Sequence, residues 1–212
     1  MPTKEVFILG AGGHAKVVID ALLLNGYPRT AIRLMDDYAV QMCTSVMGCT
    51  FFGPVDKITS PLATVHSAVG LAAVRKRLLD ASNVPTKRWL TIIHPKSVVA
   101  ETAELGAGVF VAALSVIGPE SKLGAGVIIN HGAIIDHDCQ IGEFVHIAPG
   151  ASLAGGVRIG NRVFIGAGAR ILPGVKIFDD AVVGAGAVVL TDIPKGQVWT
   201  GIPAKFIKAN ND

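Results

Sequence analysis

The most regular feature of the chain is an aliphatic residue at every sixth position of its C-terminal half. The sixteen positions of this series are Val99, Leu105, Val111, Ile117, Leu123, Ile129, Ile135, Ile141, Ile147, Leu153, Ile159, Ile165, Ile171, Ile177, Val183 and Val189. A helix repeats about every 3.6 residues and a strand about every two, so neither produces this period. A repeat of six residues is typical of a parallel β-helix built from hexapeptides.

A second series lies four residues after the first and consists of small or short side chains. Its members are Ala103, Val109, Ser115, Ser121, Val127, Ala133, Cys139, Val145, Ala151, Val157, Val163, Ala169, Val175, Ala181, Ala187 and Ile193. In a triangular coil of three hexads, the aliphatic residue points inward and the small residue turns the corner beside it. Coils that stack at about 4.8 Å would form a prism about 25 Å tall. A composition with 25 glycines and only 6% aromatic residues suits such a coil.

The first ninety residues follow a different pattern, in which strand-like apolar runs alternate with helical ones. EVFILG precedes the helical run AKVVIDALLL, IRLMDDY reads as a second strand, and ATVHSAVG precedes LAAVRKRLLDASN. This alternation predicts a small parallel sheet covered by helices. The sequence therefore predicts two domains, a Rossmann-like α/β domain over residues 1–90 and a parallel β-helix over residues 91–212.

A glycine turn joins the first predicted strand to the first helix. GAGGHA fits the G-x-G-x-x-A pattern of dinucleotide-binding folds with Gly10, Gly12 and Ala15, and Asp36 follows about twenty residues later. The domain is too short for a complete dinucleotide fold, so a single nucleoside diphosphate fits better. A tight turn whose glycines only permit close packing is the alternative.

The predicted nucleotide contacts come from the start of this helix and from the end of the second strand. Main-chain N–H groups of Gly12, Gly13 and His14 would meet a pyrophosphate or sugar at the helix N-terminus. Asp36 and Asp37 would lie where a ribose or base binds.

The charge distribution offers no electrostatic footprint for nucleic acid. The net charge is +3, and the short basic cluster Arg75, Lys76 and Arg77 reads as a solvated helix face. No apolar run reaches the length of a spanning helix, and no signal-peptide pattern begins the chain. Cys43, Cys49 and Cys139 cannot all pair within one chain, which fits a reducing compartment, and we expect a cytoplasmic protein.

Two histidines stand out within the hexads, in the stretch IIDHDCQIGEFVHIAPG. His137 and Asp138 follow the inward Ile135 by two and three residues, so we expect both at the surface. A histidine oriented by a carboxylate is a common general base. His146 lies half a coil further on, on another face, so the two histidines could share a site only between two subunits of a closed assembly.

We expect no chemical role for the other polar residues considered. His131 and His66 are expected to be solvated surface histidines. The spacing of His137, Asp138 and His146 is not that of zinc ligands, and we expect no metal.

Beyond these patterns, the chain resembles bacterial nucleotide-sugar N-acetyltransferases of the bacillosamine and perosamine type. The resemblance rests on the hexads, on DHDCQIGEFVHIAPGASLAGGV, on TGIPAKFIK and on the N-terminal GAGGHAKVV, and it covers essentially the whole chain. Sialic acid O-acetyltransferase-like proteins are similar too. The resemblance implies a left-handed β-helix that assembles as a homotrimer, with acetyl-CoA between neighbouring prisms and the nucleotide-sugar held by the N-terminal domain.

The resemblance also implies a role for individual residues. His137 would be the catalytic base, Asp138 the acid that follows it, and Asn130 a polar residue near the base. The implied acetyl-CoA contacts are His146, Gly155, Ala167 and Ala185. The implied nucleotide-sugar contacts are Gly12, Gly13, His14, Asp36, Asp37 and Gly70. The main-chain N–H of Gly155 would stabilise the oxyanion that forms on the thioester carbonyl.

The expected reaction is transfer of an acetyl group from acetyl-CoA to the C4 amine of a nucleotide-linked 4-amino-4,6-dideoxyhexose, in glycan or lipopolysaccharide precursor synthesis. O-acetylation of a sugar hydroxyl, as on sialic acid, is one alternative. A non-catalytic protein that binds sugar nucleotides is another.

Overall fold

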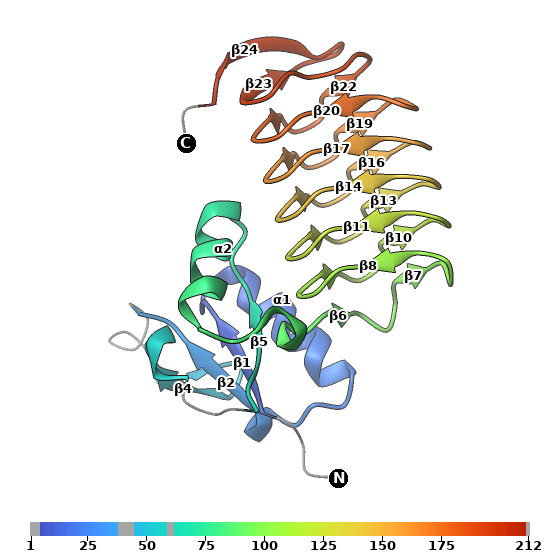
Figure 1. Ribbon diagram of the computed structural model, residues 1–212. Coiled ribbons are helices and arrows are strands. Elements are labelled where there is room, and N and C mark those ends of the chain that lie inside the picture. Colours follow the sequence, from blue (N-terminus) through green and yellow to red (C-terminus); the bar gives the residue numbers. More distant parts are fainter. Residues whose placement is uncertain (1–4, 38–44, 59–61, 211–212) are drawn as a thin grey trace.

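The computed structural model describes residues 5–37, 45–58 and 62–210 and consists of an α/β part beside a parallel coil (Figure 1). The strands of the α/β part are β1 (Val6–Leu9), β2 (Ile32–Met35), β3 (Ser45–Val46), β4 (Cys49–Gly53) and β5 (Thr64–Ser67). Its helices are α1 (Gly13–Leu24) and α2 (Ala72–Ala81), with short 3₁₀ turns η1 (Arg29–Ala31), η3 (Val55–Lys57) and η4 (Thr86–Arg88).

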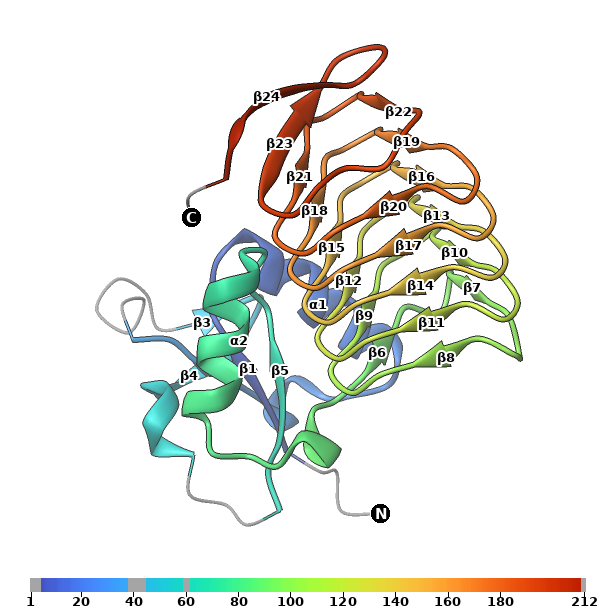
Figure 2. The same cartoon turned by 45° about the horizontal axis from the view of Figure 1, so that its top comes forward.

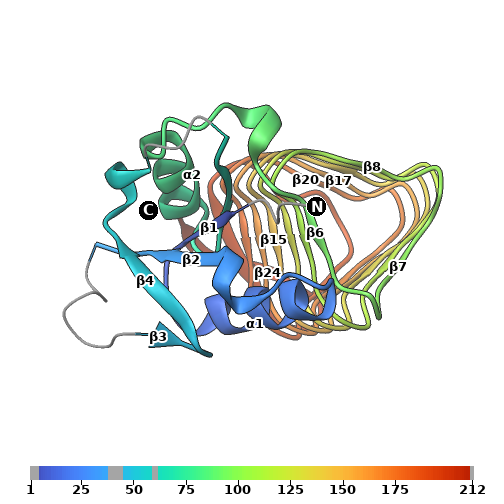
Figure 3. The same ribbon diagram turned by 90° about the horizontal axis from the view of Figure 1, so that it is seen from below.

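The sheet of the α/β part lies between the two helices (Figure 3). Its strand order is β3-β4-β2-β1-β5, with β1, β2, β4 and β5 parallel and β3 antiparallel to β4. On one face Val6 and Ile8 pack with α1, and on the other Phe7 and Leu9 pack with Leu79 of α2. This alternation along β1 is the two-residue period of a strand that is buried on both sides.

The coil confirms the predicted left-handed parallel β-helix (Figure 2). We name its three walls by what their outer faces carry. The domain-facing sheet contains β6 (Ile92–Ile93), β9 (Phe110–Val111), β12 (Ile128–Ile129), β15 (His146–Ile147), β18 (Phe164–Ile165) and β21 (Val182–Val183). It ends in the antiparallel pair β23 (Gln197–Thr200) and β24 (Lys205–Ala209).

The other two walls continue the same coils. The apolar-faced sheet contains β7 (Val98–Val99), β10 (Val116–Ile117), β13 (Ile134–Ile135), β16 (Ser152–Leu153), β19 (Arg170–Ile171) and β22 (Val188–Val189). The charged sheet contains β8 (Glu104–Leu105), β11 (Lys122–Leu123), β14 (Gln140–Ile141), β17 (Arg158–Ile159) and β20 (Lys176–Ile177).

Both predicted series of side chains fill the interior of the coil. Ile135 and Ile147 of the aliphatic series are fully buried, as are Ala133 and Val145 of the second series. Each strand pairs with the strand 18 residues further on, as Ile134 does with Ser152. Every coil is therefore held by its neighbours, and the prism is one cooperative unit.

The α/β part and the coil share a hydrophobic core. The outer faces of the first domain-facing strands carry Ile92, Phe110 and Ile128, all buried in one cluster with α1 and with β1 and β2. We propose a domain boundary between residues 90 and 91. The two parts on either side of it are packed together. Among the described residues, no helix is long and apolar enough to span a membrane.

Two expectations about polar residues are wrong. Arg75, predicted on a solvated face, is only 1% exposed, whereas Lys76 and Arg77 are exposed as expected. His66 is also 1% exposed, because its ring lies 5.9 Å from that of Phe110 on the coil, and its Nδ1 is 2.9 Å from the Leu90 carbonyl oxygen. Both errors have one cause, which is that the α/β part packs against the coil and covers these side chains.

The difference between inward and outward positions can be measured on adjacent residues. Ile171 is 2% exposed and fills the interior, while Leu172 is 38% exposed. We expect Ile171→Ala to lower the free energy of unfolding by about 2–5 kcal/mol, because it leaves a cavity. Leu172→Ala, a side chain of similar size, should cost less than about 1 kcal/mol. Chemical denaturation followed by circular dichroism measures both, and equal losses would contradict the inward assignment.

Candidate functional site

The predicted base lies at a corner of the coil, which we name the His137 corner. It comprises residues 136–139 and 154–157 and joins the apolar-faced sheet to the charged sheet. His137 Nδ1 lies 2.7 Å from Oδ2 of Asp138, and both side chains are more than half exposed. An ionised carboxylate only accepts hydrogen bonds, so Nδ1 carries the proton and Nε2 is left free to accept one.

The backbone at this corner suits the pair of side chains. Asp138 has φ +59, in the left-handed region where aspartate and asparagine are enriched among non-glycine residues. The hydrogen bond that His137 donates to Asp138, and then the charge of Asp136, raise the pKa of His137 above its usual value. The imidazole therefore holds a proton more strongly than a free histidine.

Gly155 lies one coil beyond His137 and beneath its ring. A Cβ atom at residue 155 would come within 2.5 Å of His137 Cε1 and 2.6 Å of Nε2, so only glycine lets the imidazole lie here. Within the described residues, no hydrogen bond engages the main-chain N–H of Gly155. A general base and a free N–H donor thus lie side by side on an open surface.

His146 lies in a different place, on β15 of the domain-facing sheet. Its Nδ1 is 3.2 Å from the Gly70 carbonyl oxygen, and its Nε2 is 3.3 Å from Nδ2 of Asn130. Its ring meets Phe164 edge to face at 5.3 Å. Burial, and then the charge of Arg75, lower the pKa of His146 to about 4, so the imidazole is neutral near pH 7.

Asn130 belongs to the opposite edge of the apolar-faced sheet, which we name the His131 corner. This corner comprises residues 130–133, 148–151, 166–169 and 184–187. Asn130 contacts His146 and His131, and within the described part of the chain it makes no hydrogen bond to His137. Ala167 and Ala185 stack at the same corner, since Gly186 N–H donates to the Ala167 carbonyl at 2.8 Å. Both alanines are exposed, and within the described residues their N–H groups make no hydrogen bond.

The glycine turn of the α/β part is open above the start of α1. A Cβ at Gly12 or Gly13 would meet no heavy atom within 4 Å, and the N–H groups of a helix's first turn have no partners inside the helix. Gly10 is constrained instead: its φ is +94, and a Cβ there would lie 2.6 Å from Cγ2 of Val69.

The predicted acids at the end of β2 support neighbouring loops. Asp36 Oδ2 accepts the Ala11 N–H at 2.9 Å, and Asp37 Oδ1 accepts the Val55 N–H at 3.1 Å. Asp36 therefore holds the glycine turn in place through its hydrogen bond with the Ala11 N–H.

His14 brings the glycine turn to the coil. Its ring lies edge-on to Phe110 at 5.3 Å and 6.4 Å from the ring of His146, and its buried Nε2 has no hydrogen-bond partner among the described residues. Burial, followed by the nearby imidazoles and Arg75, lowers the pKa of His14 to about 3. The predicted nucleotide residues and His146 thus adjoin one another in a single chain.

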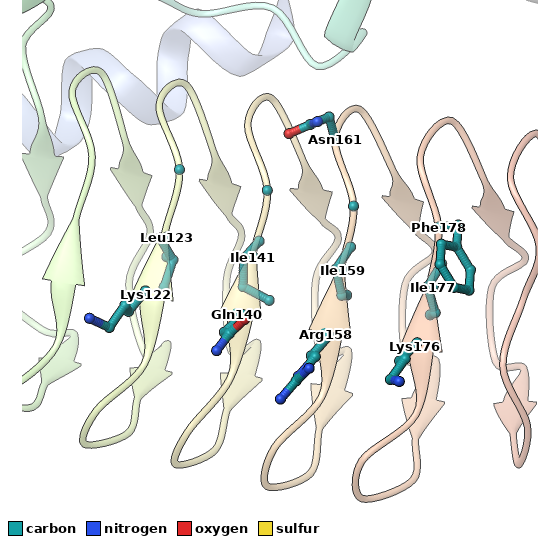
Figure 4. Close-up of a pocket in the computed structure, with 13 residues that line it drawn as sticks. Lys122, Leu123, Gln140, Ile141, Arg158, Ile159, Asn161, Lys176, Ile177 and Phe178 are labelled. Atoms are coloured by element: carbon teal, nitrogen blue, oxygen red, sulfur yellow. The ribbon is translucent and has the colours of Figure 1, made fainter.

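The predicted residues consequently form two groups in one chain. His137, Asp138 and Gly155 lie at the His137 corner, and the apolar-faced sheet separates them from the second group. The second group, at the His131 corner and the α/β part, contains Gly12, Gly13, His14, Asp36, Asp37, Gly70, Asn130, His146, Ala167 and Ala185. A groove of about 620 Å³ runs along the charged sheet past Lys122, Arg158 and Lys176, and none of the predicted residues lines it (Figure 4).

The described residues include no metal-binding cluster and two buried thiols. No group of three or more histidine, cysteine, aspartate or glutamate side chains there is placed to hold a metal ion. Burial raises the pKa of the thiols of Cys49 and Cys139, which makes both poor nucleophiles. Cys43 lies outside the described residues.

Sequence reasoning missed Arg75, which contacts Gly70 and the carbonyls around His146. A signal existed in the helix: Arg75 lies four residues before Leu79 and three after Ala72, on the helix face that carries the apolar residues.

Comparisons with known proteins match both parts of the chain. Residues 5–81 match the PglD N-terminal domain, and residues 120–155 and 156–191 match the bacterial transferase hexapeptide repeats. The UDP-N-acetylbacillosamine N-acetyltransferase of Bacillus subtilis is 32% identical over 122 residues. That alignment spans 52% of this chain and 52% of the length of that relative.

Solved structures match along nearly the whole length. The acetyltransferase domain of PglB from Neisseria gonorrhoeae, in complex with acetyl coenzyme A, is 34% identical with a TM-score of 0.89, over 97% of this chain and 100% of that one. PerB from Caulobacter crescentus, in complex with CoA and GDP-perosamine, is 36% identical with a TM-score of 0.85, over 96% of this chain and 97% of that one.

The arrangement of the site suggests one directly measurable pKa effect. In Asp138→Asn the hydrogen bond that favours protonated His137 is weakened, so the pKa of His137 should fall, and asparagine tolerates the left-handed backbone. NMR titration of the His137 ring protons measures the shift. Asp136→Asn is the matched control and should lower the pKa less, because Asp136 acts on the ring through charge alone. An unchanged pKa in Asp138→Asn would contradict the pairing.

Proposed function

Because this chain belongs to the hexapeptide-repeat acetyltransferases that carry a PglD-type N-terminal domain, we propose that it acetylates the C4 amine of a nucleotide-linked 4-amino-4,6-dideoxyhexose, with acetyl-CoA as the donor. The relatives support the substrate class: PglB is described with acetyl coenzyme A, and PerB with CoA and GDP-perosamine. A role in glycan precursor synthesis and a cytoplasmic location belong to the same proposal.

The observation that carries the proposal is the His137–Asp138 pair above Gly155. Asp138 accepts the Nδ1 proton, so Nε2 of His137 is the basic atom on the exposed side. As the sugar amine attacks the thioester carbonyl, Nε2 takes one proton from the nitrogen. The new C–N bond forms, the C–S bond breaks, and the proton can pass to the departing CoA thiolate.

Gly155 supplies the second element of the chemistry. Negative charge develops on the carbonyl oxygen of the thioester during attack, and an N–H donor placed there lowers the barrier. The N–H of Gly155 has no partner within the described residues and adjoins the base. Because the His137 ring lies close over Gly155, the basic Nε2 atom and the Gly155 N–H donor are next to each other.

The α/β part would hold the nucleotide. The first-turn N–H groups of α1 at Gly12, Gly13 and His14 suit a pyrophosphate, since the helix N-terminus carries partial positive charge. Asp36 holds the turn in shape through the Ala11 N–H. His14, beside His146, would face the sugar where the two parts of the chain meet.

A complete site requires a second copy of the chain. The His137 corner and the His131 corner lie at opposite edges of the apolar-faced sheet, so a neighbour packed on that sheet would bring one corner against the other. Its outer face supports this assembly, because Val98 is 64% and Ile134 46% exposed. A closed ring of three copies would form three equivalent clefts, each with His137 from one subunit and His146, Ala167 and Ala185 from the next.

The reaction is tested by release of CoA thiol. With UDP-, dTDP- and GDP-linked 4-amino-4,6-dideoxyhexoses, at least one should give thiol release and an N-acetylated product by mass spectrometry. His137→Ala should reduce kcat by a factor on the order of 10² with little change in melting temperature. Tight binding of an amino-sugar nucleotide without thiol release would contradict the enzyme, and acetylation of a hydroxyl analogue instead would identify an O-acetyltransferase.

The assembly is tested on the apolar-faced sheet. Ile134→Arg places a charge in the proposed interface and should convert the trimer to monomers and remove turnover, because burying an unpaired charge is unfavourable. Light scattering and thiol release measure the two effects. Gln140→Arg, on the exposed charged sheet, is the matched control and should change neither. A wild-type monomer with full activity would contradict the shared cleft.

A further inference from the structure

Arg75 is a buried cation held entirely by main-chain carbonyl groups. Its side chain is 1% exposed, and burial alone lowers its pKa, to about 10, so it remains charged near pH 7. No ion pair to a carboxylate is formed by Arg75 in the described part of the chain. Its hydrogen bonds run from Nε to Gly126 (2.8 Å), from Nη1 to Val69 and Gly70 (2.8 Å each), and from Nη2 to Phe144 (2.6 Å) and Val145 (3.4 Å).

These five bonds satisfy all five N–H donors of the guanidinium. Two of the carbonyls belong to the loop after β5, and three belong to the coil. Arg75 therefore links the α/β part to the coil at one point. That point is next to His146, because Val145 precedes it in sequence and Gly70 contacts it in space.

The Gly70 carbonyl is shared between two side chains. It accepts from Nη1 of Arg75 at 2.8 Å and lies 3.2 Å from Nδ1 of His146. A carbonyl oxygen has two lone pairs and no proton, so it can bind both groups only as an acceptor. His146 must then donate from Nδ1.

The contacts of Nε2, on the other side of the His146 ring, independently indicate that the proton is on Nδ1. The main-chain N–H of His131 donates to Oδ1 of Asn130 at 2.9 Å, which fixes the orientation of the amide. Nδ2 of Asn130 therefore faces His146 and donates to Nε2 at 3.3 Å. An Nε2 atom that accepts carries no proton, so the single proton of the neutral ring is on Nδ1.

We propose that Arg75 is a positioning residue of the acyl-transfer site, which holds the Gly70 carbonyl where it accepts the Nδ1 proton of His146 and so fixes that imidazole in one tautomer. The role of Arg75 in catalysis rests on the proposed function. The tautomer of His146 does not depend on any reaction.

The charge of Arg75 favours the neutral form of His146, and its hydrogen bond to Gly70 favours one tautomer of that neutral ring. The groups around His146 are Arg75, His14 and Asn130, with His131 beyond the amide and Phe164 at the ring edge. None of them is an acid that would favour a protonated ring. Burial and the guanidinium charge lower the pKa of His146, which keeps the ring neutral.

A fixed tautomer determines which atoms an acyl donor can meet. Nε2 of His146 is an acceptor and cannot donate to a thioester carbonyl. The Asn130 amide, which His146 holds in place, offers its second N–H at this corner beside the main-chain N–H groups of Ala167 and Ala185, which have no partner among the described residues. Asn130 thus acts at the acetyl-CoA side of the cleft within its own chain.

The tautomer can be measured in the unliganded wild-type protein. Two-bond ¹H–¹⁵N correlation spectra of histidine-labelled protein separate Nδ1–H from Nε2–H rings, and His146→Gln assigns the signal among six histidines. We expect His146 to be neutral and protonated on Nδ1 at pH 7. A ring protonated on Nε2, or on both nitrogens, would overturn the proposal whether or not the enzyme is active.

Variants of Arg75 test the positioning role itself. Arg75→Met should let the second tautomer of His146 appear and lower kcat/KM for acetyl-CoA roughly ten- to a hundredfold, because the site is displaced without losing a reacting group. Arg75→Lys, whose ammonium has only three donors, should give an intermediate loss. Arg77→Met, on the exposed face of the same helix, is the control and should leave both readouts unchanged.

The outcomes separate this inference from the proposed function. A folded Arg75→Met that keeps one tautomer and loses less than about twofold in kcat/KM shows a role in stability alone, and the proposal is then wrong. If neither Arg75 variant folds, nuclear Overhauser contacts between the guanidinium N–H groups and the Nδ1 proton of His146 in wild type decide the question. A wild-type protein without thiol release, but with the expected tautomer, would overturn the reaction and leave the arrangement intact.

Discussion

The structure depends on the register of the coil, in which each residue stacks on the residue 18 positions further along. Main-chain hydrogen bonds fix this register, as when Ile134 N–H donates to the Ala151 carbonyl and Asp136 N–H to Leu153. Because the register is rigid, a side chain at a corner always meets the same position of the next coil. His137 therefore lies over residue 155, and a free N–H lies beside the base because glycine is there.

Features that follow from local repetition could be predicted from the sequence. The six-residue period determined which residues point inward, since Ile135 and Ile147 are buried as expected, and it separated His137, at a corner, from His146, on the domain-facing sheet. The glycine turn before α1 was predictable for a related reason, because Gly10 requires a positive φ and a close approach to Val69. Both features were predictable from short sequence patterns, although the approach of Gly10 to Val69 is itself a tertiary contact.

Features that depend on the contact between the two parts could not be predicted in this way. Arg75 looks like part of a basic surface cluster, and His66 like an ordinary surface histidine, until the coil covers them. The partner of Asn130 is a similar case. The family resemblance implied that Asn130 lies near His137, yet it lies at the other edge of the sheet and contacts His146. Periodicity determines the wall on which a residue lies, and tertiary packing determines what it touches there.

The reversal of the chain at β23 and β24 has a consequence for how copies of this protein can associate. A parallel coil ends in a row of unpaired main-chain groups, on which another chain could continue the ladder without limit. Here the last strand runs backwards along β23, and it carries Lys205 and Lys208 on an exposed edge. Growth along the prism axis is thereby discouraged. Copies can still pack side by side through the walls of the prism. When such contacts are related by rotation about an axis, they close into a ring after a few copies, which favours a small oligomer over a fibre.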